Sequence, residues 1–251
     1  MVNKILITIP TCEVEGHNLN WKESRDTWVI EAKNKGYDVI FTKPSTSIPS
    51  KKHIIKDGFL FSKSKDIWDD LFRKRVLSVC NWIKDFNIEQ YDWIFFIDSD
   101  TFVNIEKFDK EIPKILNEYP GVDYMGCANP YEGWYPHSPF YKFIYKEKTF
   151  ASGFGFMLSK KACRILAQKY KDEDYSYITL GRDDVIVGDL MYKNGIPLLH
   201  NNSFSKESKW RKKLIDPQSI GTPHIGDSNS HVYVQHYING HMKEIQNELK
   251  S

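Results

Sequence analysis

A short apolar run that ends in acidic residues constrains this chain more than any other feature. Residues 93–97, WIFFI, are all apolar, and Asp98, Ser99 and Asp100 follow them before the chain turns apolar again. A continuous run of this length is typical of a strand buried on both faces of a sheet. Ligands of open α/β sheets bind at the carboxyl ends of such strands. The run therefore predicts a buried strand with two carboxylates at a ligand-binding edge.

The two carboxylates, Asp98 and Asp100, are spaced so that both can serve one site. Hard divalent cations such as Mg²⁺ and Mn²⁺ take carboxylate oxygens and share phosphate oxygens with a substrate. One interpretation is a clamp for a metal ion and a diphosphate. The other is an acidic turn at the start of the next helix, where Asp is common.

Composition limits the class of protein. The chain has 251 residues, of which 41% are hydrophobic and 14% aromatic, and these values exclude disorder. Lys and Arg total 35 against 33 Asp and Glu, and a net charge of +2 argues against a nucleic-acid partner. No apolar window is long enough to predict a membrane span.

The cellular compartment is predicted from the N-terminus and the cysteines. The first residues, MVNKILITIP, lead straight into a strand-like run without the apolar core of a signal peptide. Cys12, Cys80, Cys127 and Cys163 are widely spaced and form no C-x-x-C pair, which argues against zinc and for free thiols. We expect a cytoplasmic protein. The alternative is a soluble catalytic domain of a secretory-pathway enzyme.

Strand-like and helix-like segments alternate along most of the chain. This alternation predicts an α/β fold with a mainly parallel central sheet and helices on both faces, in a single domain over residues 1–251. The expected strands cover residues 4–9, 37–42, 59–61, 93–97, 124–127, 150–158, 196–199 and 232–238. The expected helices cover residues 23–35, 66–86, 108–117, 160–170 and 183–193, with a loop over residues 44–57.

A second acidic pair, Asp183 and Asp184, opens the last of these helices. Acidic residues at a helix N-terminus stabilise it by about 0.3–1 kcal/mol, which is one explanation of the pair. The other makes one carboxylate a general base that faces the metal clamp. The glycines at 153 and 155 allow a backbone to approach a ligand closely, although two glycines often mark a simple turn. His236 is either a buried strand residue or a ligand.

Taken together, these segments resemble the β-1,3-glycosyltransferases related to fringe and to the β-1,3-galactosyltransferases, glycosyltransferase family 31. The family's elements "R-x-T-W", "YDW…DDDTYV", "SGTGYVFS", "EDVYVG" and "HY" have counterparts in the same order here. These counterparts are residues 25–28 (RDTW), 91–103 (YDWIFFIDSDTFV), 152–159 (SGFGFMLS), 183–188 (DDVIVG) and 236–237 (HY). Ser99 replaces the middle acid of the usual triplet, and Arg75 stands where the family has a lysine.

The resemblance implies a GT-A fold, a UDP-sugar donor and inversion at the anomeric carbon. It implies Mn²⁺ or Mg²⁺ as cofactor, bound by Asp98, Asp100 and His236. Asp184 would be the base that takes the proton from the acceptor hydroxyl. The nucleotide-sugar contacts implied are Thr8, Arg25, Arg75, Asp98, Ser99 and Gly153, and the acceptor contacts expected are Trp134, Tyr135 and Asp183.

The sequence therefore predicts a metal-dependent, inverting glycosyltransferase that moves a sugar from UDP to a hydroxyl of a glycan or glycosylated acceptor, with β-1,3 linkage. The nucleotide-sugar half would cover about residues 1–125 and the acceptor half about residues 126–251. Two alternatives stay open. One is a transferase with a different linkage and donor, and the other is a non-catalytic sugar- or nucleotide-binding protein on the same fold. A metal-dependent phosphotransferase ranks lower, because no P-loop or kinase motif is present.

Overall fold

The structure is a computed structural model. It describes residues 4–11, 20–44, 54–56, 59–62, 83, 88–98, 101–129, 150–171, 174, 183–201, 204 and 247. The described strands are β1 (Ile5–Pro10), β2 (Asp38–Pro44), β3 (Ile54–Lys56), β4 (Phe59–Ser62), β5 (Trp93–Phe96), β6 (Tyr124–Asn129), β7 (Phe150–Ser159) and β8 (Leu199–His200). The described helices are α1 (Asn20–Asp26), α2 (Trp28–Asn34), the 3-10 turn η1 (Ile88–Gln90), α4 (Ile105–Glu118), α6 (Lys160–Lys169) and α7 (Asp183–Lys193).

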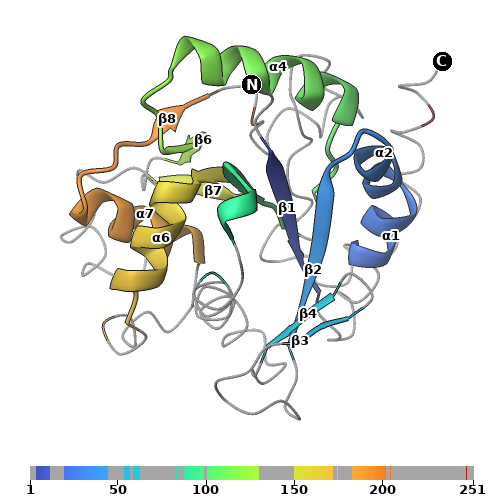
Figure 1. Cartoon of the computed structure of the whole chain (residues 1–251), viewed down its shortest axis with the longest axis horizontal. Helices are drawn as coiled ribbons and strands as arrows, with labels where there is room; N and C mark the ends of the chain where they lie inside the picture. The colour runs from blue at the N-terminus through green and yellow to red at the C-terminus, as the bar shows by residue number, and fades with distance from the viewer. Residues whose placement is uncertain are drawn as a thin grey trace, which may run out of the picture.

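The eight strands form one sheet in the order β3-β4-β2-β1-β5-β7-β6-β8 (Figure 1). Strands β4, β2, β1 and β5 are parallel to one another, and β6 and β8 are parallel as well. Strand β7 runs antiparallel to both β5 and β6, so only β3 and β7 are reversed. The predicted mainly parallel sheet is confirmed. Strands from before and after residue 125 belong to this one sheet, and the proposed division into two halves stays a prediction.

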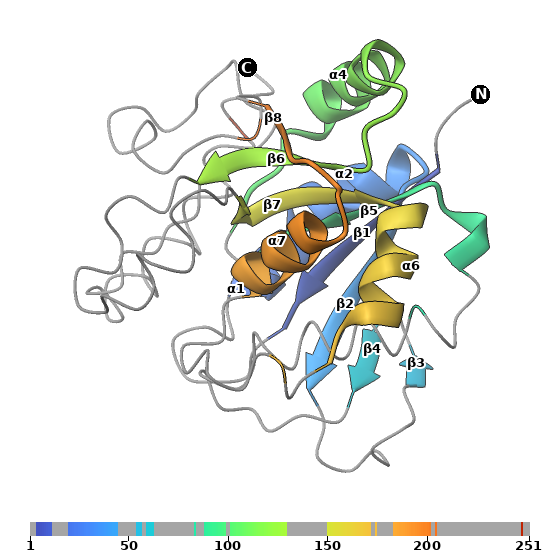
Figure 2. The same ribbon diagram turned by 90° about the vertical axis from the view of Figure 1, so that its left-hand side faces the viewer.

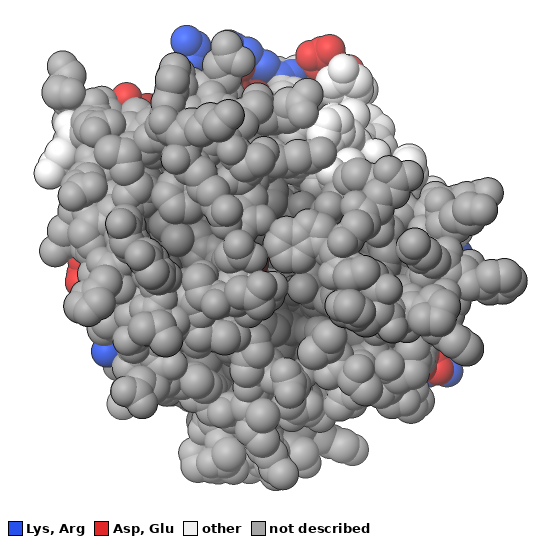
Figure 3. Space-filling view, turned by 180° about the vertical axis from the view of Figure 1, so that it is seen from behind, with Lys and Arg blue, Asp and Glu red and all other residues white. Residues whose placement is uncertain are grey.

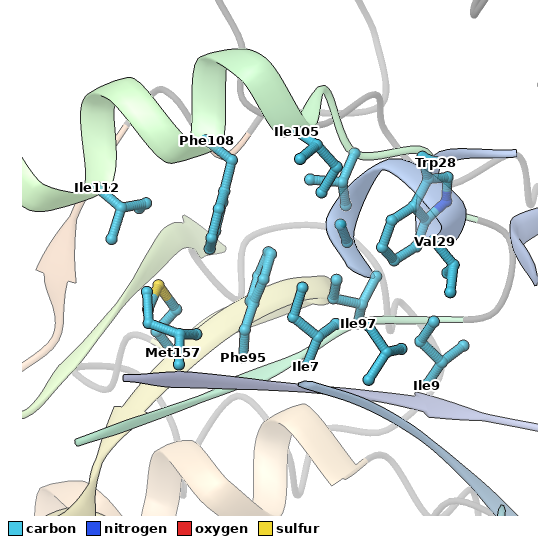
Figure 4. Close-up of a cluster of buried hydrophobic side chains, with 14 of the residues drawn as sticks. Ile7, Ile9, Trp28, Val29, Phe95, Ile97, Ile105, Phe108, Ile112 and Met157 are labelled. Atoms are coloured by element: carbon cyan, nitrogen blue, oxygen red, sulfur yellow. The ribbon is translucent and has the colours of Figure 1, made fainter. Parts of the chain in front are cut away.

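Helices cover both faces of the sheet, as predicted. Helices α6 and α7 pack on one face (Figure 2), where Ile94, Phe96 and Phe156 meet Leu166 and Leu190 in one buried cluster. Helices α1, α2 and α4 cover the other face, with side chains such as those in Figure 4. Because successive side chains of a strand point to opposite faces, each central strand contributes to both clusters. This explains why residues 93–97 form a continuous apolar run.

Helix α4 shows how its sequence pattern creates one buried face. Ile105, Phe108 and Ile112 are fully buried against the sheet, with Phe108 stacked on Phe95 at 5.0 Å between ring centroids. Asn104 caps the helix by accepting a hydrogen bond from the Lys107 backbone N–H at 3.1 Å. The helix thus begins three residues before its predicted start. Charged side chains of both signs gather along the upper rim in Figure 3, the side on which α4 lies in Figure 1.

The predicted helix over residues 23–35 is helical over most of its length but is not continuous, because α1 and α2 are separate helices. Thr27 lies between them with φ −122° and ψ −110°, outside the helical region. Its hydroxyl donates to the carbonyl of Glu23 at 2.7 Å, and its backbone N–H donates to the carbonyl of Ser24 at 3.4 Å. A threonine side chain that bonds the preceding turn competes with the helical backbone ladder.

Two further expectations are corrected. The predicted loop over residues 44–57 contains β3, which is held by antiparallel pairing with β4. The strand predicted at 196–199 starts only at Leu199, because Ile196 still closes the end of α7 through a bond from its N–H to the Met191 carbonyl at 3.0 Å. Gly195 permits this turn with φ +70°. The helix expected at 66–86, apart from Ile83, and the strand at 232–238 lie outside the described residues.

Among the helices that the structure describes, none is both long and apolar enough to cross a membrane.

Candidate active site

The carboxyl edge of the sheet is where the predicted site residues should meet. Strands β1, β2 and β5 all end at this edge, and so does β6 because it runs the same way. Strand β7 starts there, since Asn129 at the end of β6 pairs with Phe150. The chain between Asn129 and Phe150, which includes the predicted acceptor contacts Trp134 and Tyr135, therefore leaves and rejoins the sheet at this edge.

Three buried threonines shape the ends of β1 and β2. Thr8 is 2% exposed, and its hydroxyl lies 3.5 Å from the Phe95 carbonyl. Thr11 donates to the Thr42 carbonyl through both its backbone N–H, at 2.8 Å, and its hydroxyl, at 3.1 Å. These bonds fix the point at which the chain leaves β1. Thr8 was predicted as a nucleotide contact, whereas the sequence pattern gave no signal for Thr11 or Thr42.

Asp98 follows β5 at this edge and is only 8% exposed. The β1–β5 ladder extends to its neighbour, since the Ile97 N–H donates to the Thr8 carbonyl at 3.1 Å. Ile97 belongs to the buried cluster on the α4 face, and Asp98 follows it directly. The Asp98 backbone carbonyl accepts from the Thr101 N–H at 3.2 Å, which closes a turn that begins at Asp98 and ends at Thr101.

Thr101 is a further polar residue of this turn that the sequence analysis did not single out. It is 3% exposed, and its hydroxyl is buried without a hydrogen-bond partner. Buried hydroxyls are nearly always satisfied, so an exception beside a carboxylate turn is informative. The Thr101 hydroxyl is therefore a buried polar group at this edge that the described residues do not satisfy.

Asp184 lies in the first turn of α7 and is 8% exposed. Its carboxylate accepts from the Val185 backbone N–H at 2.8 Å. The other end of α7 lies beside Asp123, which precedes β6 at the amino edge. The N-terminus of α7 therefore points toward the carboxyl edge, at which Asp98 follows β5. The structure thus brings the predicted base and one predicted metal ligand to one edge of the sheet.

A glycine holds α7 close to the sheet at this point. A Cβ atom added to Gly188 would lie 2.3 Å from the Phe150 Cβ, so only a glycine permits the present contact. Phe150 is the first residue of β7. The glycine of the family-like segment DDVIVG therefore has a packing role, and this role fixes the distance between α7 and the sheet edge.

The glycine-containing segment of β7 is a continuous strand and not a turn. Gly153 lies in its first half, near the carboxyl edge. Gly155 faces the core, since a Cβ there would meet the Phe95 ring at 3.3 Å and the Phe204 ring at 3.7 Å. Close approach at Gly155 is therefore to aromatic rings.

Arg25 lies in α1 and is about half exposed. Its guanidinium binds Asp26 in two hydrogen bonds, at 2.7 and 3.0 Å, and lies 5.6 Å from the Trp21 ring centroid. The hydrogen bond to Asp26 raises the pKa of Arg25. A nucleotide contact by Arg25 stays a prediction, and it would require the guanidinium to exchange this partner or to share it.

Several predicted site residues lie outside the described part of the chain. These are Arg75, Ser99, Asp100, Trp134, Tyr135 and His236. For Asp183 and Gly153, the structure describes the backbone only. Within the described ranges, no group of three or more His, Cys, Asp or Glu side chains could hold a metal ion. Asp98 is the one predicted metal ligand among the described residues, and a buried carboxylate is a ligand that a hard cation accepts.

Two polar residues near the site were missed, and both have a structural explanation. Asp189 is 3% exposed on α7 and forms an ion pair with Lys193 at 2.6 Å. His200 accepts a hydrogen bond at Nδ1 from the Ala128 N–H at 2.9 Å, at the irregularity in the β6–β7 register. No pattern in the sequence distinguishes either residue from surface polar residues.

No protein-family profile and no curated protein matches this sequence. A solved structure does match, that of a glycosyltransferase involved in the glycosylation of the major capsid of PBCV-1. The two align with a TM-score of 0.57 and 13% sequence identity, over 96% of this chain and 98% of the other. At this identity the likeness concerns the fold. The predicted fold class is confirmed, and the chain has the Rossmann-like α/β fold of a glycosyltransferase.

Proposed function

We propose that this protein is a metal-dependent, inverting glycosyltransferase that uses a UDP-sugar and forms a β-1,3 linkage to a glycan or glycosylated acceptor. The observation that carries the proposal is the convergence of Asp98 and Asp184 at the carboxyl edge of a glycosyltransferase-like sheet. Open α/β sheets bind nucleotide ligands at this edge. Relationship to the fringe and β-1,3-galactosyltransferase family is part of the proposal and depends on the sequence resemblance alone.

The donor would bind where Asp98 ends β5. Asp98, with Asp100 and His236, would hold Mn²⁺ or Mg²⁺, and Thr8, Arg25, Arg75, Ser99 and Gly153 would contact the nucleotide-sugar. A divalent ion bound there supplies Lewis-acid stabilisation of the diphosphate leaving group. The buried threonine hydrogen bonds keep the strand ends rigid, so that little ordering is needed when the donor binds.

Asp184 would act on the acceptor. Its carboxylate would take the proton from the acceptor hydroxyl as the oxygen attacks the anomeric carbon from the face opposite the diphosphate. The new C–O bond forms as the bond to the diphosphate breaks, and UDP leaves with the electron pair. One in-line step requires one base, which fits the buried carboxylate of Asp184 in the first turn of α7. Trp134, Tyr135 and Asp183 would contact the acceptor.

The test is a screen of several UDP-sugars for hydrolysis with Mn²⁺, with Mg²⁺ and with EDTA. We expect UDP release from at least one donor, dependent on a divalent ion. Asp98→Asn should abolish release, and Asp100→Ala should abolish Mn²⁺-dependent UDP binding in calorimetry, while both variants unfold cooperatively. Undiminished metal-dependent binding by Asp100→Ala would remove that residue from the proposed metal site.

The same screen separates the alternatives. Metal-dependent UDP binding without any sugar release or transfer would favour a non-catalytic sugar- or nucleotide-binding protein. Release from a donor, with a product of another linkage, would favour a different transferase.

The cytoplasmic location is also a proposal. Cys127 and Cys163 are both buried, and we expect all four thiols to react after denaturation without reductant.

A further inference from the structure

A cavity of about 610 Å³ opens at the amino edge of the sheet, away from the candidate active site. Three segments form it: the end of α4 with the turn into β6, one side of α6, and the chain from α7 to β8. The β6–β7 pairing runs from Tyr124 at this edge to Asn129 at the other. Five residue steps of about 3.3 Å separate the two edges by roughly 17 Å. The cavity is therefore distinct from the edge that holds Asp98.

The walls of this cavity are fixed by local hydrogen bonds. The Val122 N–H donates to the Tyr119 carbonyl at 3.1 Å, which closes the turn after α4. Asn194 donates from its side-chain amide to the Leu190 carbonyl at 2.8 Å, and Gly195 completes the end of α7 with φ +70°. Such walls need little ordering when a ligand binds, which is a property of preformed sites.

The lining combines an exposed aromatic ring with apolar and polar groups. Tyr119 is 44% exposed, and its hydroxyl bonds to the Glu118 carboxylate, which raises the pKa of Tyr119. Ile165 and Leu198 supply apolar surface. Asn194 adds an amide beside them. An aromatic ring that remains exposed beside amide and carboxylate groups can stack on the apolar face of a pyranose while the polar groups bind its hydroxyls.

The charges of the lining exclude other ligand classes. Asp123 is occupied by Ser159 and Lys161, at 2.5 Å each, so the one lysine of the lining is already paired. Glu118 and Asp123 together would repel a phosphate or nucleotide.

We propose that this cavity is a second carbohydrate-binding site that takes a neutral oligosaccharide. Glycan binding here does not depend on the proposed transfer reaction. Its use as an anchor for a distant part of the acceptor does rest on the proposed function.

The test is binding of the whole protein to an array of neutral hexasaccharides built from glucose, galactose and N-acetylglucosamine. We expect binding of at least one of them, and Tyr119→Ala should weaken it by about tenfold through loss of ring contact. Tyr192→Ala is the matched control, because Tyr192 is 55% exposed but lies outside the cavity lining. Both variants should keep the wild-type melting temperature and UDP-sugar hydrolysis.

Asp98→Asn separates this proposal from the proposed function. It should keep array binding while losing hydrolysis. Tyr119-dependent binding by a protein without any hydrolytic activity would support the second site and contradict the enzyme. Absence of binding to every hexasaccharide, or binding that Asp98→Asn abolishes and Tyr119→Ala leaves intact, would overturn the second site.

Discussion

Polar groups at the two edges of the sheet differ in their burial and in their hydrogen bonding. At the amino edge, charged residues contact one another: Asp92 accepts from the Lys4 backbone N–H at 2.9 Å, and Lys160 lies 3.9 Å from Asp92. Arg164 pairs with Glu89 and lowers the pKa of that carboxyl. At the carboxyl edge, Asp98, Asp184 and Thr101 are buried, and the hydroxyl of Thr101 has no partner.

The difference indicates which edge is built for stability and which for a ligand. Groups at the amino edge are exposed or satisfied by neighbours from other elements, so they hold strand ends and helix starts in place. Burial of carboxylates costs free energy that a fold alone rarely justifies. Substitutions at the amino edge should therefore change stability without changing chemistry, and substitutions of the buried carboxylates Asp98 and Asp184 should do the reverse.

The largest effect is expected from Asp184→Asn. The amide keeps a side-chain oxygen that can accept from the Val185 N–H, so the free energy of unfolding should change by no more than about 1 kcal/mol. The amide cannot take a proton, so transfer should fall by about 10²–10⁴-fold. Transfer to the acceptor should be measured together with UDP-sugar affinity and melting temperature.

Donor affinity should persist in this variant. Near-normal transfer by well-folded Asp184→Asn would show that the Asp184 carboxylate stabilises the helix N-terminus and is not the base. Asp183 would then be tested by the same substitution.

Gly188→Ala should have the next largest effect, on stability. The new Cβ would lie 2.3 Å from the Phe150 Cβ and 3.1 Å from its Cα, so α7 must shift. Overpacking of this kind costs about 1–3 kcal/mol. Denaturant unfolding measures it, and Gly121→Ala is the control, because a Cβ there meets nothing within 4 Å. Equal stability of the two variants would contradict the close contact.

Ser159→Ala should lower stability at the amino edge. Its hydroxyl accepts from the Ala162 N–H at 3.1 Å, which caps α6, and donates to Asp123 at 2.5 Å. Loss of a cap costs about 1 kcal/mol, and loss of the Asp123 contact adds to it. UDP-sugar hydrolysis per folded molecule should stay unchanged. A double-mutant cycle with Asp123→Ala should give a coupling energy above about 0.5 kcal/mol, and full additivity would argue against the contact.

The sequence predicted the parts of this fold that have a clear period or a clear end. The apolar run at 93–97 identified the central strand, because both its faces are covered. Helix α7 was placed with its observed bounds, since Asn194 and Gly195 end it with φ +70° at the glycine. Thr27 interrupts a predicted helix through its side-chain hydrogen bonds to the preceding turn. A threonine inside a helical pattern does not predict such an interruption.

The candidate site was predictable in part. Asp98 and Asp184 were named from their positions after a buried strand and at a helix start, and the structure brings both to one edge. Thr11 and Thr101 could not be named, since only tertiary packing buries their hydroxyls. The role of Gly188 was equally hidden, because it depends on Phe150, a residue far away in the sequence.

Alkaline pH should expose a smaller effect at the amino edge. Burial and the hydrogen bond to Asp38, at 2.8 Å, raise the pKa of Tyr91. The pKa of tyrosine in the unfolded chain is about 10. The stabilisation that the protonated Tyr91 hydroxyl provides is therefore fully present below about pH 10 and is lost as the pH rises above that value. Tyr91→Phe should lose about 1 kcal/mol at pH 7 and show a flatter fall in melting temperature above pH 10. If the melting temperature of Tyr91→Phe falls as steeply above pH 10 as that of the wild type, the loss of stability at alkaline pH comes from other groups.

The smallest change in stability, with an unusual sign, is expected from Thr101→Val. The substitution removes a buried hydroxyl that has no partner, so the free energy of unfolding should stay equal or rise by up to about 1 kcal/mol. Thr11→Val is the matched control, because the Thr11 hydroxyl donates to the Thr42 carbonyl at 3.1 Å and its loss should cost about 1 kcal/mol. If the hydroxyl of Thr101 finds its partner only when the Asp98 turn binds metal and UDP, Thr101→Val should also weaken UDP binding in calorimetry. Destabilisation of Thr101→Val as large as that of Thr11→Val would show that its hydroxyl already has a partner in the unliganded protein.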